Sequence, residues 1–361
     1  MTATRRAFLQ TTLAAAAALP VTGWADVGAP THLSAARTVQ GEYALVGLRA
    51  DGSQAFVLPL PSRGHAAAAH PTEPTAVAFA RRPGTYAMVI DCASGQVAQQ
   101  LAAPDGHHFY GHGTYSQNGR VLFTTENHIV SGQGRIGVWD AAAGYTRLGD
   151  FSSGGIGPHE MLRQPGADVL VIANGGIRTD PTHGRAKLNL ESMRPNLTHM
   201  RPDGAILHVA ELPADAHQNS IRHIAAFDDG RIAAAFQWQG DPFGAPSIAG
   251  VYLPDQGIRL LNMSETMLRG LDGYAGSVAV LDQRHIAVTF PRGGVMHMFD
   301  TKTDSVLTLP QADICGVAPA RGGGMATDGL GHVHAMTAGG VRLLARHDLA
   351  FDNHLIRIGG A

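Results

Sequence analysis

One feature limits most strongly what this chain can fold into. It is a series of short predicted strands, separated by turn residues, with no helical segment among them. After residue 26, no window carries apolar residues at helical spacing over three turns. Runs rich in β-forming residues occupy the chain instead, and most end in Gly, Asp, Asn or Pro. The predicted strands are residues 43–48, 55–60, 76–80, 86–91, 121–125, 136–140, 169–173, 231–236, 277–281, 285–289 and 296–300.

Two pieces of sequence recur along this string of strands. In the first, a strand runs into an aspartate that begins a turn, at Asp91, Asp140 and Asp300, where the side chain can cap its own turn. In the second, a polar residue leads a strand of small or apolar residues, at spacings of 38 to 64 residues. These leading residues are His70, His112, His159, His223, Ser277, Cys315 and His354.

The spacing of these leading polar residues predicts an all-β fold, a seven-bladed β-propeller. Seven units share about 336 residues, so each has about 48, and a four-stranded blade needs about 40–50. The last inner strand, 353–358, is followed only by Gly-Gly-Ala, so strands 43–48 and 55–60 would complete its blade and close the ring. Residues 26–361 would then be one domain. The alternative, a pair of β-sandwiches, requires a linker that the composition does not show.

The first 25 residues have the features of an export signal. Arg5 and Arg6 precede Phe-Leu, an apolar run covers 13–19, and small residues end at Ala25. The run is too short for a membrane span, which needs about 20 apolar residues. We therefore expect 1–25 to be a twin-arginine signal peptide removed after Ala25, which leaves a periplasmic protein with no membrane span.

The charge balance argues against one class of partner. The net charge is −2 and the isoelectric point is about 6.8. A protein that binds nucleic acid needs a surplus of basic side chains to neutralise phosphates. We therefore expect no nucleic-acid partner.

Chemistry is expected where the inner strands of the propeller begin, because these starts line one mouth of the central channel. That register places His112, His159 and His223 around the mouth, with Glu126 and Glu160 nearby. Further candidates for the same opening are His70, His354 and Cys315. Imidazole and carboxylate ligands suit Fe, Cu or Zn. The other interpretation is structural, since each histidine could bond a neighbouring strand and no His-Glu-x-x-His motif is present.

Further polar side chains suggest other uses of the mouth. Arg178, Arg222 and Arg292 could hold an anion, or could instead pair with the two glutamates. His332 and His334 alternate on one strand face, where they could bind metal or simply face solvent. The remaining candidate ligand-binding residues are Asn174, His108, Ser277 and Tyr274.

Many of these residues lie in segments that resemble one family of exported bacterial proteins, the family of domain of unknown function 1513. The resemblance covers most of the chain after the signal. The segments are HFYGHG (108–113), TEN (125–127), GIGPHE (155–160), NGGIR (174–178), GRAKLNL (184–190), MRP (193–195), SIRH (220–223), GSV (276–278), PRGG (291–294) and CGVA (315–318).

The resemblance implies a seven-bladed propeller of the quinoprotein amine dehydrogenase-like type, with repeats similar to WD40 and YVTN repeats. It also implies a role in iron handling, because such proteins are typically encoded beside imelysin-type proteins and a di-haem protein. It supplies no reaction and no catalytic residues.

The sequence leaves three functions open. The leading hypothesis is a periplasmic binding or accessory protein for iron acquisition, with a metal ion or metal complex in the mouth. The second is a metal-dependent hydrolase of lactonase type, with Glu160 or His223 as general base. The third is a scaffold that docks an imelysin-like partner. Partners would be an imelysin-type or di-haem periplasmic protein.

Overall fold

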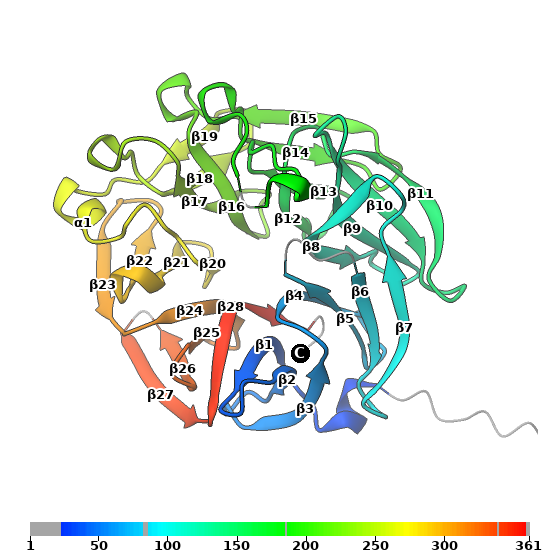
Figure 1. Cartoon of the computed structure of the whole chain (residues 1–361). Helices are drawn as coiled ribbons and strands as arrows, with labels where there is room; N and C mark the ends of the chain where they lie inside the picture. The colour runs from blue at the N-terminus through cyan, green and yellow to red at the C-terminus, as the bar shows by residue number, and fades with distance from the viewer. Residues whose placement is uncertain (1–22, 82–85, 185, 338, 359–361) are drawn as a thin grey trace, which may run out of the picture.

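The computed structural model describes residues 23–81, 86–184, 186–337 and 339–358. Within these residues the strands form seven four-stranded antiparallel sheets, arranged as blades around a central axis (Figure 1). The seven-bladed propeller predicted from the spacing is confirmed.

Each blade runs from an inner strand at the channel to an outer strand at the rim. Blade 1 contains β4 (Gly64–Ala69), β5 (Thr75–Ala80), β6 (Tyr86–Asp91) and β7 (Gln96–Ala102). Blade 2 contains β8 (His107–Tyr115), β9 (Val121–His128), β10 (Gly134–Asp140) and β11 (Thr146–Ser152). Blade 3 contains β12 (Pro158–Arg163), β13 (Leu170–Asn174), β14 (Asn196–Met200) and β15 (Ile206–Glu211).

The other blades repeat this order. Blade 4 contains β16 (Asn219–Ala226), β17 (Ile232–Trp238), β18 (Ala249–Leu253) and β19 (Gly257–Leu260). Blade 5 contains β20 (Ser277–Val280), β21 (His285–Phe290), β22 (Val295–Asp300) and β23 (Val306–Pro310). Blade 6 contains β24 (Ile314–Ala320), β25 (Gly323–Asp328), β26 (His332–Thr337) and β27 (Gly340–Arg346).

Blade 7 closes the ring with strands from both ends of the chain. Its inner strand is β28 (Leu349–Arg357), which pairs with β1 (His32–Thr38), followed by β2 (Tyr43–Leu48) and β3 (Gln54–Leu60). Figure 1 shows the red end of the chain beside the blue start. The closure was predicted, but with two N-terminal strands instead of three. β1 was missed because its residues give no clear β pattern, although its first five are buried.

The inner strand of blade 1 differs from the sequence prediction. His70 was expected to lead this strand, but β4 ends before it. His70 lies in the turn, where its Nδ1 accepts a hydrogen bond from the Glu73 amide at 2.9 Å. The histidine that β4 carries toward the channel is His65.

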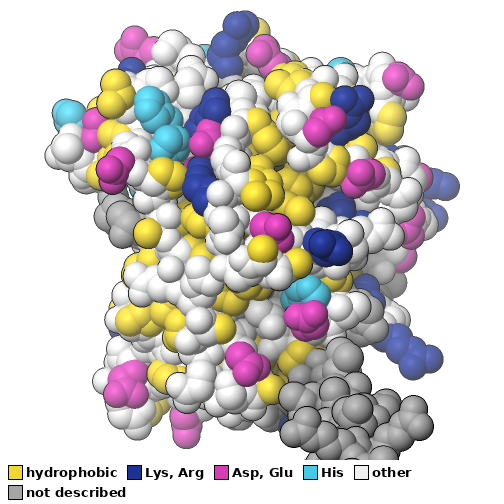
Figure 2. All heavy atoms as spheres, turned by 90° about the vertical axis from the view of Figure 1, so that its right-hand side faces the viewer, with side chains coloured by type: hydrophobic (Ala, Val, Ile, Leu, Met, Phe, Trp, Pro, Cys, Tyr) yellow, Lys and Arg dark blue, Asp and Glu magenta, His cyan; other side chains and the backbone are white. Residues whose placement is uncertain are grey.

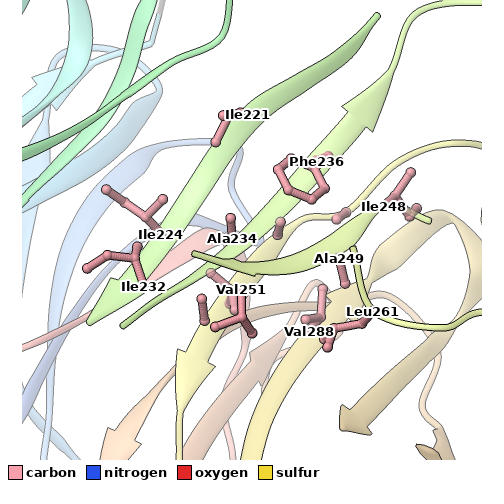
Figure 3. Packing of buried hydrophobic residues seen from close by; sticks show 14 of the residues in the cluster. Ile221, Ile224, Ile232, Ala234, Phe236, Ile248, Ala249, Val251, Leu261 and Val288 are labelled. Atoms are coloured by element: carbon pink, nitrogen blue, oxygen red, sulfur yellow. The ribbon is translucent and has the colours of Figure 1, made fainter. Parts of the chain in front are cut away.

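Blades are held together by apolar side chains packed between neighbouring sheets. Figure 3 shows one such region, where Ile221, Phe236 and Val251 of blade 4 belong to the same apolar cluster as Val288 of blade 5. The middle strand β17 carries three fully buried alanines in a row, 233–235, whose small side chains let adjacent sheets approach closely. Each Å² of apolar surface buried here contributes about 25 cal/mol.

The outer strands face solvent. β7 and β15 are largely exposed, and Figure 2, a view of the side of the ring, shows acidic and basic side chains scattered among apolar ones. One short α-helix, α1 (Glu265–Arg269), lies among the described residues, and the Ser264 side chain caps its start. Single-turn 3₁₀ helices occupy Trp24–Val27 (η1), Pro181–His183 (η2), Leu190–Ser192 (η3), Ala214–Ala216 (η4), Pro242–Gly244 (η5) and Pro291–Gly293 (η6).

The expected signal peptide lies mostly outside the described residues, and Arg5 and Arg6 are among those not described. Trp24, which cleavage after Ala25 would remove, packs with the core of blades 7 and 1. Its indole N–H donates a hydrogen bond to the His70 carbonyl at 2.9 Å. Among the described residues, no helix is both long and apolar enough to span a membrane.

Candidate functional site: a histidine cluster below a basic mouth

Five histidines meet in the central channel, one from each of five consecutive inner strands. Neighbouring imidazole rings have centroids 4.5 to 5.1 Å apart. The corresponding positions of β20 and β24 carry Ser277 and Cys315. The histidines are His354 of β28, His65 of β4, His112 of β8, His159 of β12 and His223 of β16.

Irregular strand pairing directs these side chains inward. Each of the five inner strands departs from regular register with the next strand at or beside its histidine. In β12, Pro158 pairs with Asn174 and Glu160 with Ala173, so His159 is the extra residue of a bulge. A bulge breaks the two-residue alternation and re-aims side chains. It therefore lets two consecutive residues, His159 and Glu160, reach the same cluster.

Glu160 supplies the carboxylate of the cluster. Its Oε2 lies 3.3 Å from Nδ1 of His223 and accepts a hydrogen bond from the Ile224 amide at 3.1 Å. Its Oε1 lies 3.8 Å from Nδ1 of His112. The backbone donor and the two imidazoles hold the carboxylate in one orientation.

Ligand atoms in the cluster are close enough to share an ion. One group is His65, His112 and His159, and a second is His112, Glu160 and His354; within each, one atom per residue lies within 4.8 Å of the others. Four buried ring nitrogens have no hydrogen-bond partner in the protein: Nδ1 of His65 and Nε2 of His112, His223 and His354. Leaving such atoms unsatisfied costs about 1–3 kcal/mol each, so the cluster favours a bound species.

His159 shows the bonding typical of a metal-ligating histidine. Its Nδ1–H donates to the Arg222 carbonyl at 2.9 Å. A carbonyl accepts only, so this contact fixes the tautomer and leaves Nε2 with a lone pair. Backbone carbonyls commonly orient ligating histidines in this way.

Burial keeps the imidazoles neutral. It lowers the pKa of His65, His112 and His159 well below the usual value, with nearby cationic groups and histidines adding to the effect. It lowers the pKa of His223 to about 3 and of His354 to about 4. Burial raises the pKa of Glu160 to about 7. Neutral imidazole is the form that binds metals, so the histidines need no deprotonation near neutral pH.

Above the cluster lies a basic mouth, a cavity of about 480 Å³ at the start of the inner strands. His65, His159 and His223 are among its lining residues. Within the part of the chain that the structure describes, no Asp or Glu lines this cavity. Arg63 pairs with Asp352 at 2.6 Å and Arg292 with Asp272 at 2.6 Å, both carboxylates outside the lining. Its basic side chains are Arg63, Arg81, Lys187, Arg222 and Arg292. The mouth is therefore electropositive and suited to an anion.

The sequence-predicted metal ligands separate into two places. His112, His159, His223 and Glu160 come together in the cluster. Glu126 does not join them, because its carboxylate is bound within blade 2. Its two oxygens accept hydrogen bonds from Arg147 at 2.8 and 2.9 Å, and Oε1 also accepts one from the Thr124 hydroxyl at 2.8 Å.

The predicted ligand-binding residues also divide. Arg222, Arg292 and Tyr274 line the mouth, and the Arg292 guanidinium lies 4.3 Å from the centre of the Tyr274 ring. The other four, Arg178, Asn174, His108 and Ser277, are not among its lining residues.

These four have contacts elsewhere. The Asn174 amide bonds Asn196 and Thr198 inside blade 3, and Ser153 in the connection that precedes this blade. Ser277 donates to the Val317 carbonyl at 3.4 Å, which links blades 5 and 6. His108 lies 3.3 Å from the Asn127 amide, and Arg178 donates to the Val130 carbonyl at 3.2 Å.

His65 was missed by sequence reasoning, and His354 was placed among the further candidates for the mouth but not among the metal ligands. One signal was available. His65, His112 and His159 are evenly spaced by 47 residues, which is the blade repeat itself. Placing His70 at the inner strand hid this regularity, because the alanine-rich sequence of β4 does not mark where the strand begins.

Comparison with protein-family models gives one match, "Protein of unknown function (DUF1513)", over residues 58–358. The chain belongs to this family. The match spans the five histidines and Glu160, and it agrees with the resemblance read from the motifs. No curated protein matches this DUF1513 chain.

Solved structures similar to this DUF1513 protein share its fold. One is the hydrazine synthase of Kuenenia stuttgartiensis, with 12% identity, a TM-score of 0.61, and coverage of 89% of this chain and 96% of that one. Another is U3-55K, with 12% identity, a TM-score of 0.57, and coverage of 80% and 82%. A chain of a mitotic checkpoint complex has 11% identity, a TM-score of 0.54, and coverage of 79% and 80%. At such low identity these likenesses show the propeller architecture alone.

Proposed function

We propose that this DUF1513 propeller binds a transition-metal ion, or a small metal complex, in its histidine cluster and serves as a periplasmic accessory protein in iron acquisition. One observation carries the proposal. Five inner strands deliver histidines to one point, together with Glu160, and leave four buried ring nitrogens without a protein partner.

The donor set suits several metals. Imidazole nitrogens with one carboxylate oxygen suit Fe, Cu, Zn or Ni. By the Irving–Williams order, Cu²⁺ and Zn²⁺ would bind more tightly than Fe²⁺ in a simple titration. Specificity for iron would then depend on which metal is available and on how it is presented.

The basic mouth supplies a way to present the metal. A chelated metal commonly carries carboxylate oxygens, and guanidinium groups bind carboxylates in a bidentate fashion. Arg222 and Arg292 would hold the anionic part of such a complex while the histidines below contact the metal. Lys187, from the segment that precedes η3, lines the same mouth and would add a further cationic group.

Location and partners follow the sequence signals. The Arg5-Arg6 motif supports export by the twin-arginine route, which carries folded proteins. An imelysin-type or di-haem periplasmic protein would be the partner that receives or delivers the metal. This part of the proposal rests on the family resemblance.

The test is elemental analysis of protein purified from its native periplasm, beside a His112→Gln/His159→Gln variant. We expect the wild type to hold at least one equivalent of Fe, Cu or Zn that the folded variant lacks. A His208→Gln variant, changed at an exposed histidine of β15, should keep the full metal content.

Equal metal content in wild type and double variant would overturn the proposal. The same preparations distinguish the metal-binding proposal from the hydrolase and scaffold functions. Turnover of lactone substrates that depends on the metal would indicate a hydrolase. Tight binding of an imelysin-type protein by the metal-free variant would indicate a scaffold.

A further inference from the structure

A second group of metal-binding side chains lies in blade 6, away from the channel. Asp328 ends β25, and His332 and His334 are the first and third residues of β26. Alternate residues of a strand point to the same face, so both imidazoles share one side of the sheet. The turn between the strands brings Asp328 to them.

The three ligand atoms are tightly grouped. Asp328 Oδ2 lies 2.9 Å from Nδ1 of His332 and 3.1 Å from Nε2 of His334. Ligands of a tetrahedral zinc ion lie about 2.0–2.2 Å from it, which puts them about 3.3 Å from one another. The two separations from Asp328 are already close to that value, and all three ligand atoms lie within 4.8 Å of one another. Small side-chain movements would therefore admit an ion.

The surroundings of Asp328 fix the carboxylate and crowd one of its oxygens. Oδ1 accepts hydrogen bonds from the Leu330 and His332 amides at 3.0 and 2.9 Å. Oδ2 faces both imidazoles and the Gln311 amide, which donates at 3.0 Å. Three nitrogens thus converge on an oxygen with two lone pairs. A cation among the imidazoles and Oδ2 would resolve this crowding.

The group opens on one side to solvent. A cavity of about 400 Å³ is lined by His332, His334, Gln311 and Arg346, with Leu309 and Leu343 among its apolar walls. Asp328 lies fully buried behind the two histidines. Two protein nitrogens and one oxygen would therefore fill three positions of a four-coordinate ion, and the fourth would face the cavity.

Two histidine–carboxylate contacts outside the channel lack this third member. His285 lies 2.9 Å from Asp282 and His183 lies 3.9 Å from Asp180, and neither pair belongs to a three-residue group within the part of the chain that the structure describes. These two are ordinary surface pairs, and the three-residue group of blade 6 differs from them by its second imidazole.

We propose that Asp328, His332 and His334 form a second site, for a borderline divalent cation such as Zn²⁺, independent of the histidine cluster in the channel. The ligand set of two imidazoles and one carboxylate is one that Zn²⁺ uses when it keeps a position open. The blade 6 site would exchange its ion more readily than the channel, because it opens directly to solvent.

The experiment counts Zn²⁺ bound per folded chain, by titration calorimetry and by elemental analysis after desalting. Four proteins are compared: wild type, His332→Gln, His112→Gln/His159→Gln, and the triple variant. His332 is partly exposed, so its replacement should not prevent folding, which circular dichroism would verify. His285→Gln serves as the matched control for the loss of a histidine paired with an aspartate.

We expect two, one, one and no Zn²⁺ ions in these four proteins, and two in the control. The His112→Gln/His159→Gln variant distinguishes the channel site from the blade 6 site. If it binds none while wild type binds one, only the channel site exists and the blade 6 site is overturned. If His332→Gln binds as many ions as wild type, or if wild type binds none, the blade 6 site is likewise overturned.

Discussion

At the scale of single residues, similar side chains have different roles according to what surrounds them. Glu126 and Glu160 are both glutamates near the channel end of a strand. Glu126 faces Arg147 inside blade 2, where its charge is neutralised. Glu160 faces histidines and accepts one further hydrogen bond, from the Ile224 amide, among the residues that the structure describes. The first is a structural ion pair, and the second is available to a metal.

Glu126→Gln tests this division. The amide keeps the shape but loses the charge that Arg147 requires, so we expect unfolding to become easier by about 2–3 kcal/mol. Urea denaturation would measure the loss. Metal content should stay at the wild-type level, and a Glu126→Gln protein that folds but loses its metal would contradict the assignment.

The burial of His297 leads us to expect a pH dependence of stability that is unrelated to either proposed metal site. It is buried beside Phe290, and burial lowers its pKa to about 4. Unfolded, it would titrate near 6.5, so as pH falls from about 6.5 toward 4 the unfolded state takes up a proton that the folded state refuses. Stability therefore falls across that window, by about 2 kcal/mol from this group by pH 5.

Urea unfolding at pH 7 and pH 5 would measure this fall. His297→Gln keeps a polar group near Thr308 but cannot titrate, so its stability should depend less on pH than that of the wild type. An equal pH dependence in both proteins would mean that other groups are responsible.

At the scale of elements, the bulged inner strands matter most. A regular strand would direct His159 and Glu160 to opposite faces, with one of them between blades. The extra residue in β12 removes that constraint, and similar irregularities recur in β4, β8, β16 and β28. The bulges thus interrupt some hydrogen bonds between paired strands, and in return the side chains of the inner strands can meet at the axis.

The short helix η1 provides a prediction about the start of the folded domain. Trp24 is largely buried and its indole bonds the His70 carbonyl. We expect Trp24→Ala to reduce stability by about 2–4 kcal/mol, since a large aromatic contact is lost. Thermal and urea unfolding would measure the change, with exposed Val39→Ala as the control. No change for Trp24→Ala would show that the domain does not need residues before Ala25.

At the scale of the whole molecule, ring closure joins the two ends of the chain. β28 supplies the inner strand of blade 7 and also carries His354, so closure and completion of the cluster are the same event. The Ile358 amide donates to the Thr31 carbonyl at 2.9 Å, which places the ends of the two segments side by side. The metal proposal therefore couples metal binding to an intact ring.

A circular permutant would test this account of closure. Joining residue 358 to residue 31 by a short linker and opening the chain between Pro61 and Ser62 would place all four strands of blade 7 in sequence. Permutation succeeds at exposed connections, so we expect a folded propeller with unchanged metal stoichiometry. It should be less stable than the wild type, because it lacks η1 and the contacts of Trp24. Circular dichroism and elemental analysis would verify both. A permutant that folds without its metal would contradict the coupling.

The sequence by itself determined the architecture. Alternating apolar runs, Asp turns and a repeat of about 48 residues admit little besides a seven-bladed ring, because each blade must bury both faces against its neighbours. The same repeat brought out His112, His159 and His223, since equivalent positions of successive blades lie at the same depth of the channel.

Only the tertiary structure decided which side chains meet. The bulges that turn His159 and Glu160 together leave no mark in the residue pattern, because they depend on how each inner strand pairs with the next. Long-range contacts also placed Glu126 against Arg147, brought His354 beside His65, and set Asp328 against His332 and His334. Spacing in the chain limits such encounters, but the packing of separate strands determines them.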